Sequence, residues 1–134
     1  MTEQNNPFHK KKSGVFFFKS SNPYEFYDLL NGIDMEPKQD VWGTLIFPEN
    51  AKLPCPVIVP IHGSAGLREG HHTHMVNLLE AGFAVFRIHH FESRGVISIV
   101  ENQTQVTLAT MITDAFRALA LLNKHPDIDK NKIG

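Results

Sequence analysis

The segment PVIVPIHGSAG, residues 56–66, joins a continuous apolar run to a turn that contains two glycines. The run from Val57 to Ile61 has the pattern of a strand buried on both faces of a parallel sheet. Because Pro60 has no backbone N–H, we expect the hydrogen bonding of this strand to end near Val59. The glycine-containing turn therefore begins at the carboxyl end of a parallel strand.

Downstream of this segment, helical and strand patterns alternate. A helical stripe ends at Ala81-Gly82, and Phe83–Ile88 follows as a second buried strand. Apolar residues three and four apart predict a long helix over Glu101–Leu122, ended by Pro126, and Lys130–Gly134 begins a further strand. The apolar face of the long helix consists of Leu108, Met111 or Ile112, Ala115, Leu119 and Leu122. This order predicts an α/β fold with a parallel sheet.

Upstream of the segment, the patterns are those of shorter elements at one edge of the sheet. Val15–Phe18 and Val41–Phe47 are rich in β-branched and aromatic residues and predict two strands. Tyr24–Leu30 predicts a short helix between them, and Pro48–Pro56 predicts an exposed hairpin-type turn. Residues 1–13 are polar, and we expect them to form a disordered tail.

Composition excludes several classes of protein. The 134 residues are 42% hydrophobic, with 13 Lys+Arg against 14 Asp+Glu, so one soluble domain is expected and nucleic acid is not expected as a partner. The basic run Lys10–Lys12 lies in the polar tail. One cysteine, Cys55, excludes a disulfide scaffold and favours a reducing cytoplasm. No apolar run approaches the length that would span a membrane.

The turn at residues 62–66 has two interpretations. Glycines at the carboxyl end of a parallel strand let backbone N–H groups point inward, where they can stabilise negative charge on a substrate oxygen. Alternatively, Gly63 and Gly66 only allow a tight connection between strand and helix. Composition and spacing do not decide between the two.

Several segments together resemble the α/β-hydrolases, in particular the dienelactone hydrolase-like branch. The resemblance covers roughly Val41 to Gly134 and rests on these segments in this order: Pro56–Gly66, Glu80–Val85, Phe91–Val96, Asp114–Leu119 and Pro126–Gly134. It implies that the backbone N–H of Ser64 is one donor of an oxyanion hole, with Gly63 allowing its orientation. It further implies that His62 and Gly66 support the turn. Arg94 would lie at the pocket mouth or form an exposed salt bridge.

The same resemblance implies a nucleophile in a G-x-[Ser or Cys]-x-G elbow, followed by an acid and a histidine. Among the nine glycines only Gly66 and Gly70 are four apart, and Arg68 stands between them, so these residues contain no elbow. Ser64 and Cys55 are not at the nucleophile position. We therefore expect the catalytic triad beyond Gly134, and interpret residues 14–134 as the N-terminal part of an α/β-hydrolase domain, truncated before the nucleophile strand.

Eight histidines raise the question of a metal site. Five of them could lie near the carboxyl ends of the strands: His71, His72, His74, His89 and His90. Their spacing does not match the helical H-E-x-x-H zinc motif, so we expect neither a metal nor a cofactor. The pair His89-His90 also departs from the resemblance, because an acidic or small residue commonly stands there.

Two function classes follow. The first is part of a serine or cysteine hydrolase of small-molecule esters or lactones, inactive as these 134 residues alone. The second is a non-catalytic module that binds a small molecule or a partner. We also expect the 134 residues alone to self-associate or to fold poorly, because an open strand edge and an apolar helix face would be exposed.

Overall fold

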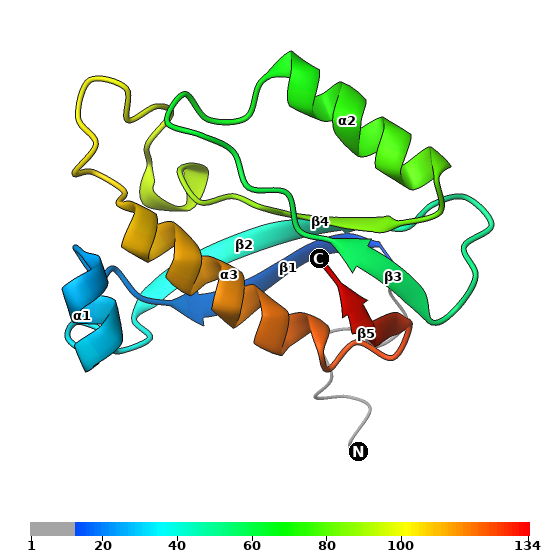
Figure 1. Cartoon of the computed structure of the whole chain (residues 1–134), viewed down its shortest axis with the longest axis horizontal. Helices are drawn as coiled ribbons and strands as arrows, with labels where there is room; N and C mark the ends of the chain where they lie inside the picture. The colour runs from blue at the N-terminus through cyan, green and yellow to red at the C-terminus, as the bar shows by residue number, and fades with distance from the viewer. Residues whose placement is uncertain (1–12) are drawn as a thin grey trace.

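The computed structural model describes residues 13–134, which form a mixed α/β fold around one five-stranded sheet with the order β1-β2-β4-β3-β5 (Figure 1). The strands are β1 (Gly14–Ser20), β2 (Gln39–Ile46), β3 (Cys55–Ile58), β4 (Ala84–Ile88) and β5 (Ile128–Ile133). β1, β2 and β4 pair antiparallel, whereas β3 pairs parallel with both β4 and β5. The predicted α/β class with two β elements at one edge is confirmed.

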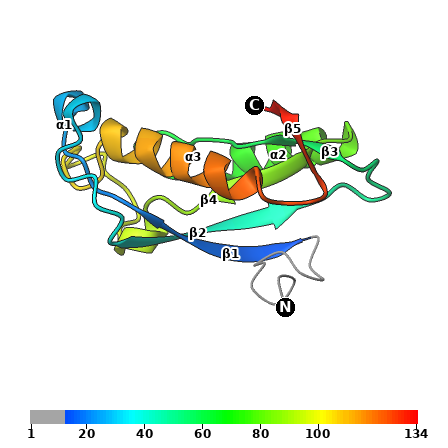
Figure 2. The same cartoon turned by 90° about the horizontal axis from the view of Figure 1, so that it is seen from below.

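Three helices and one 3-10 turn connect the strands. They are α1 (Phe26–Asn31), α2 (Glu69–Glu80), η2 (Glu92–Arg94) and α3 (Leu108–Leu122). α3 packs along β1 and also contacts β4 and β5, as the view from below in Figure 2 shows, while α2 contacts β4. No helix within residues 13–134 combines the length and the apolar character needed to cross a bilayer.

The hydrophobic core lies between α3 and the sheet. Its fully buried members include Val41 and Leu45 of β2, Phe86 of β4, and Ala118 and Leu122 of α3. Alternate residues of β4 point to this core, because side chains along a strand alternate between its two faces. The short β1 and β2 patterns, the buried strand over β4 and the final strand β5 were all correctly predicted.

Three predictions about the elements were wrong. The long helix begins at Leu108 rather than Glu101, because Thr107 caps it and the residues before it form turns. The 48–56 connection is no hairpin, since β4 lies between β2 and β3. The run from Val57 to Ile61 is not buried throughout: Val57 is fully buried, the three residues after it are partly buried, and Ile61 is 53% exposed.

The first residues of the chain are only partly tested. The expected tail covers residues 1–13, of which 1–12, including Lys10–Lys12, lie outside the described residues. Ser13 accepts a hydrogen bond through its hydroxyl from the backbone N–H of Phe47, at 3.1 Å. The described chain thus begins in contact with the end of β2.

Candidate functional site

The turn at residues 62–66 follows the carboxyl end of β3, and Gly66 is the residue that its conformation requires. Gly66 has φ +77°, and a Cβ atom there would lie 2.9 Å from the carbonyl oxygen of Ile97. Gly63 is not among the glycines with positive φ, and a Cβ atom at Gly63 would meet no atom within 4 Å. The expectation that Gly63 provides the backbone conformation that the turn requires is therefore wrong. Gly66 has that role.

Two hydrogen bonds to the Gly63 carbonyl oxygen fix the orientation of the peptide unit between Gly63 and Ser64. The Gly63 oxygen accepts from His62 Nδ1 at 2.9 Å and from the Gly66 backbone N–H at 3.0 Å. Because a trans peptide is planar, its N–H points away from its carbonyl, so these two bonds also set the direction of the Ser64 N–H. That N–H has no hydrogen-bond acceptor among residues 13–134. The turn thus presents one oriented backbone donor.

The loop that follows η2 is attached to the same residue. The Ser64 carbonyl accepts from the Ile99 backbone N–H at 2.8 Å and from the Ser98 hydroxyl at 3.3 Å, while the Ser64 hydroxyl donates to Gln103 Oε1 at 2.9 Å. Between turn and loop lies a pocket of about 330 Å³. It is lined by His62, Gly63, Ser64, Ile99, Gln103, Val106, Thr107, Leu108 and Met111.

His62 supports the turn from a buried position, with 7% of its surface exposed. Burial is the main cause that lowers the pKa of His62, so the ring is neutral near pH 7. A carbonyl oxygen can only accept, and the contact with Gly63 therefore assigns the ring hydrogen to Nδ1. His62 Nε2 is buried and has no hydrogen-bond partner among the described residues. The ring packs edge-on against His90 and Phe91.

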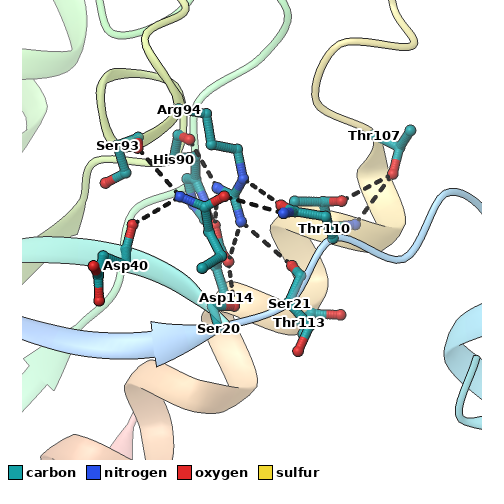
Figure 3. A network of polar contacts seen from close by, with 12 residues as sticks. Ser20, Ser21, Asp40, His90, Ser93, Arg94, Thr107, Thr110, Thr113 and Asp114 are labelled. Carbon is teal, nitrogen blue, oxygen red and sulfur yellow. Dashed lines mark hydrogen bonds and ion pairs between the residues drawn. The ribbon is translucent and has the colours of Figure 1, made fainter. Parts of the chain in front are cut away.

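A buried polar network is centred on Asp114 of α3 (Figure 3). It includes His90, whose ring packs against that of His62. Arg94 donates to both carboxylate oxygens, through Nη1 to Oδ2 at 2.8 Å and through Nη2 to Oδ1 at 2.9 Å. His90 Nδ1 lies 2.8 Å from Oδ2, and the Ser20 hydroxyl donates to Oδ1 at 2.5 Å. The network joins the ends of β1 and β4 to η2 and α3.

One of the two sequence expectations for Arg94 is wrong. Its side chain is only 7% exposed, so it is not an exposed salt bridge. It lines a polar pocket of about 330 Å³ with Asn22, Gln39 and Gln105, and this pocket shares Thr107 with the pocket beside Gly63 and Ser64. It also donates to the His90 carbonyl and to Asn22 Oδ1. Arg94 thus orders the segment after β4.

The carboxylate of Asp114 is ionised despite its burial. Burial by itself would raise the pKa of Asp114, but hydrogen bonds from His90 and Arg94, with the charge of Arg94, outweigh it and lower the pKa. Ser20, His90 and Asp114 are the residue types of a catalytic triad, yet hydroxyl and imidazole both bind the carboxylate rather than each other. Ser20 is also fully buried. The network is therefore not a nucleophilic centre.

This network was not predicted from the sequence. Asp114 lies in the middle of an apolar helix, and a buried carboxylate needs a charged or hydrogen-bonding partner. That conflict with the apolar pattern was the available signal. It pointed to no particular partner, because Arg94 lies outside the helix and Ser20 is 94 residues away in the chain.

The other histidines are separate from the turn. His71, His72 and His74 belong to α2, where His71 Nδ1 accepts from the Arg68 backbone N–H at 2.9 Å. His89 stacks on Trp42 and contacts Thr44 Oγ1 through Nε2 at 2.8 Å. Residues 13–134 contain no group of three or more His, Cys, Asp or Glu side chains placed to hold a metal ion. Cys55 is buried at the start of β3, away from the turn.

No family model matches this sequence, and no curated protein matches it either. Among solved structures, a proposed dienelactone hydrolase from Klebsiella pneumoniae subsp. pneumoniae MGH 78578 superposes with a TM-score of 0.57 at 12% identity, covering 90% of this chain and 48% of its own. The fold is that of the N-terminal half of an α/β-hydrolase.

Two further structures match this α/β-hydrolase half-fold at lower scores. A glucuronoyl esterase from Solibacter usitatus has a TM-score of 0.49 at 17% identity, covering 92% of this chain and 45% of its own. The dienelactone hydrolase-like promiscuous phosphotriesterase P91, from metagenomic libraries, has a TM-score of 0.44 at 18% identity, covering 89% of this chain and 47% of its own. The chain thus spans about half the length of the solved structures it matches.

Proposed function

We propose that this chain is the N-terminal part of a dienelactone hydrolase-like enzyme that cleaves ester or lactone bonds, and that it supplies one donor of the oxyanion hole. The observation that carries the proposal is the Ser64 backbone N–H, which is oriented from the carbonyl side of its peptide and has no acceptor among residues 13–134. A donor of this kind stabilises the negative charge that develops on the carbonyl oxygen during acyl transfer.

The remaining catalytic groups would come from sequence that continues past Gly134. These are a serine or cysteine nucleophile, an acid, a histidine and the second oxyanion donor. We therefore propose that the 134 residues alone form no covalent intermediate. No metal or cofactor is part of the proposal, and a cytoplasmic location is proposed from the single buried cysteine.

The pocket beside the turn supports a small, largely apolar substrate. Its wall includes Ile99, Val106, Leu108 and Met111, with the amide of Gln103 as a polar group near Ser64. Such a lining binds an apolar acyl or ring group by the hydrophobic effect, while the amide can orient a polar atom. A neutral ester or lactone has this mixture of properties.

The second candidate is a module that binds a small molecule or a partner without catalysis. It is favoured by one observation, the absence of a nucleophile elbow from these residues. The coding sequence after Gly134 distinguishes the two candidates. An elbow of the form G-x-[Ser or Cys]-x-G in that sequence supports the enzyme. A stop codon at that point supports the binding module.

Variants of Ser64 test the enzyme directly in the polypeptide that continues past Gly134. Ser64→Pro removes the N–H donor and should lower kcat roughly a hundredfold or more, with little change in KM. Ser64→Ala keeps the N–H and should retain most activity. Circular dichroism and urea unfolding confirm that both variants fold. Near wild-type kcat in a folded Ser64→Pro variant would rule out the oxyanion assignment.

The separate 134-residue chain provides a second check. An activated ester should give no burst of product with this chain, because residues 13–134 hold no nucleophile in the required geometry. A burst that disappears in Ser64→Ala would instead make Ser64 the nucleophile and overturn its assignment as a backbone donor.

A further inference from the structure

The direction of the Ser64 N–H depends on the ring of His62, and the ring of His62 depends in turn on its neighbours. We infer that His90 is a positioning residue for the turn at residues 62–66 and acts through the ring of His62. The catalytic consequence of this inference rests on the proposed function, whereas its structural part does not.

The ring of His62 is held by two aromatic contacts from the segment after β4. Its centroid lies 4.5 Å from that of Phe91, with the planes at 68°, and 5.6 Å from that of His90, with the planes at 83°. Both are edge-to-face arrangements, which aromatic rings favour. A rotation of the His62 ring would break the Nδ1 contact with the Gly63 oxygen, so these contacts maintain the turn.

The contact between the two histidines is packing and not a hydrogen bond. Each Nδ1 is already occupied, by the Gly63 oxygen in one ring and by Asp114 Oδ2 in the other. Neither Nε2 atom has a hydrogen-bond partner within residues 13–134. His62 is therefore kept in place by the shape of the surface against it, and His90 forms one side of that surface.

His90 is itself fixed more firmly than an ordinary core side chain. It is fully buried, and its Nδ1 contacts the carboxylate that also binds Arg94 and Ser20. Bidentate binding by Arg94 fixes the orientation of that carboxylate. The position of the turn after β3 is thereby linked to the end of β1, to η2 and to α3.

Three variants of His90 separate ring packing from hydrogen bonding. His90→Phe keeps an aromatic ring against His62 but removes the donor to Asp114. His90→Asn keeps a short donor but removes the ring. His90→Ala removes both. If the ring is what positions His62, the turn should be preserved in the Phe variant and disturbed in the Asn and Ala variants.

The readout is nuclear magnetic resonance of the 134-residue chain. We expect the order parameter of the Ser64 amide to fall from a rigid value of about 0.85 to below about 0.6 in His90→Asn and His90→Ala. In the same variants the imidazole ¹⁵N spectrum of His62 should change from the Nδ1–H form to a mixture of both tautomers. His90→Phe should restore both signals, which a loss of global stability alone would not do.

His89→Ala is the matched control. His89 precedes His90 in the chain and also contacts a ring, but that ring is Trp42 and not His62. This control should leave the Ser64 amide unchanged. An unchanged Ser64 amide and His62 tautomer in a folded His90→Ala chain would overturn the inference, as would equal disturbance by His89→Ala or a failure of His90→Phe to restore the signals.

Kinetic measurements on the polypeptide that continues past Gly134 test the catalytic consequence of the inference. His90→Ala should lower kcat about tenfold or more with little change in KM, because small displacements of an oriented group cost large factors in rate. His90→Phe should recover most of that loss. If the polypeptide has no hydrolase activity, the proposed function fails, whereas the resonance measurements still decide whether His90 positions the turn.

Discussion

Gly63 and Gly66 are three residues apart in the same turn but have different physical roles. Gly66 adopts a left-handed conformation beside the Ile97 carbonyl, and Gly63 does neither. Gly66→Ala should therefore lower the free energy of unfolding by at least about 1–2 kcal/mol, since an L-residue resists positive φ. Gly63→Ala should stay within about 0.5 kcal/mol of the wild type. Urea unfolding of both variants measures the difference, and equal losses would contradict this assignment.

The buried His62 and the partly buried His89 predict how stability depends on pH. Burial is the main cause that lowers the pKa of both His62 and His89 below the ordinary value of 6.5, and for His89 the charge of Arg87 adds to it. As the pH falls through 6.5, the unfolded chain takes up these protons before the folded chain does. Stability should therefore decrease from about pH 7.5 to pH 5.

Urea unfolding across that range tests this dependence. His89→Gln should have a shallower curve than the wild type, because one of the two rings whose pKa is lowered by burial is gone. The exposed His74 of α2 provides the control variant His74→Gln, which should keep the wild-type curve. Asp114 does not contribute to the pH dependence of stability in this range. Its pKa is lowered from 3.8, so its stabilising effect is lost only when the pH falls below that value. A level wild-type curve between pH 7.5 and 5 would contradict the prediction.

At the scale of elements, α3 shows that the buried face of a helix can include polar residues. Its fully buried face includes Met111, Asp114, Ala118 and Leu122, and it packs on the sheet or on the loop before the helix. Of the predicted stripe, Met111 and Leu122 are buried, Ile112, Ala115 and Leu119 are partly buried, and Leu108 is exposed. The predicted face was therefore correct only in part, because polar Thr110, Thr113 and Asp114 also belong to the buried side.

The beginning of α3 is set by Thr107. Its hydroxyl accepts from the Thr110 backbone N–H at 3.2 Å and donates to the Pro23 carbonyl at 2.9 Å. Thr107→Ala should lower the free energy of unfolding by about 1 kcal/mol, as loss of an N-cap commonly does, whereas Thr107→Ser should retain most of it. Chemical unfolding of the two variants measures this, and equal stability of Ala and Ser variants would show that the cap contributes nothing.

At the scale of the whole molecule, one end of the sheet remains open. β5 is an edge strand, and beside it an apolar groove of about 260 Å³ lies between β3 and α3. The groove is lined by Val59, Ile61, Ile112, Ala115, Phe116, Leu119, Ile133 and Gly134. An open edge next to an apolar surface favours association, because it leaves both backbone hydrogen bonds and apolar area to be satisfied by another chain.

We propose that the 134-residue chain self-associates through this end. Phe116, which is 65% exposed in the groove, is the residue to change, and Phe116→Lys should shift the sedimentation profile towards monomer. Phe17→Lys is the matched control, because Phe17 is 69% exposed on β1 at the opposite edge of the sheet. A monodisperse wild-type monomer with strong hydrogen-exchange protection along β3 and β4 would refute the proposal.

The amino-acid sequence alone determined the type and order of nearly all elements, the α/β class with parallel strands around β3, and the place of the turn after β3. These features follow from apolar periodicity and from the positions of glycine and proline, which are local signals between residues close together in the chain. Only the tertiary structure decided that β4 lies between β2 and β3 and that Gly66 rather than Gly63 adopts positive φ. It alone also brought Asp114 to Ser20, Arg94 and His90. Each of these depends on atoms that meet only when distant segments pack together, so no local pattern could reveal them.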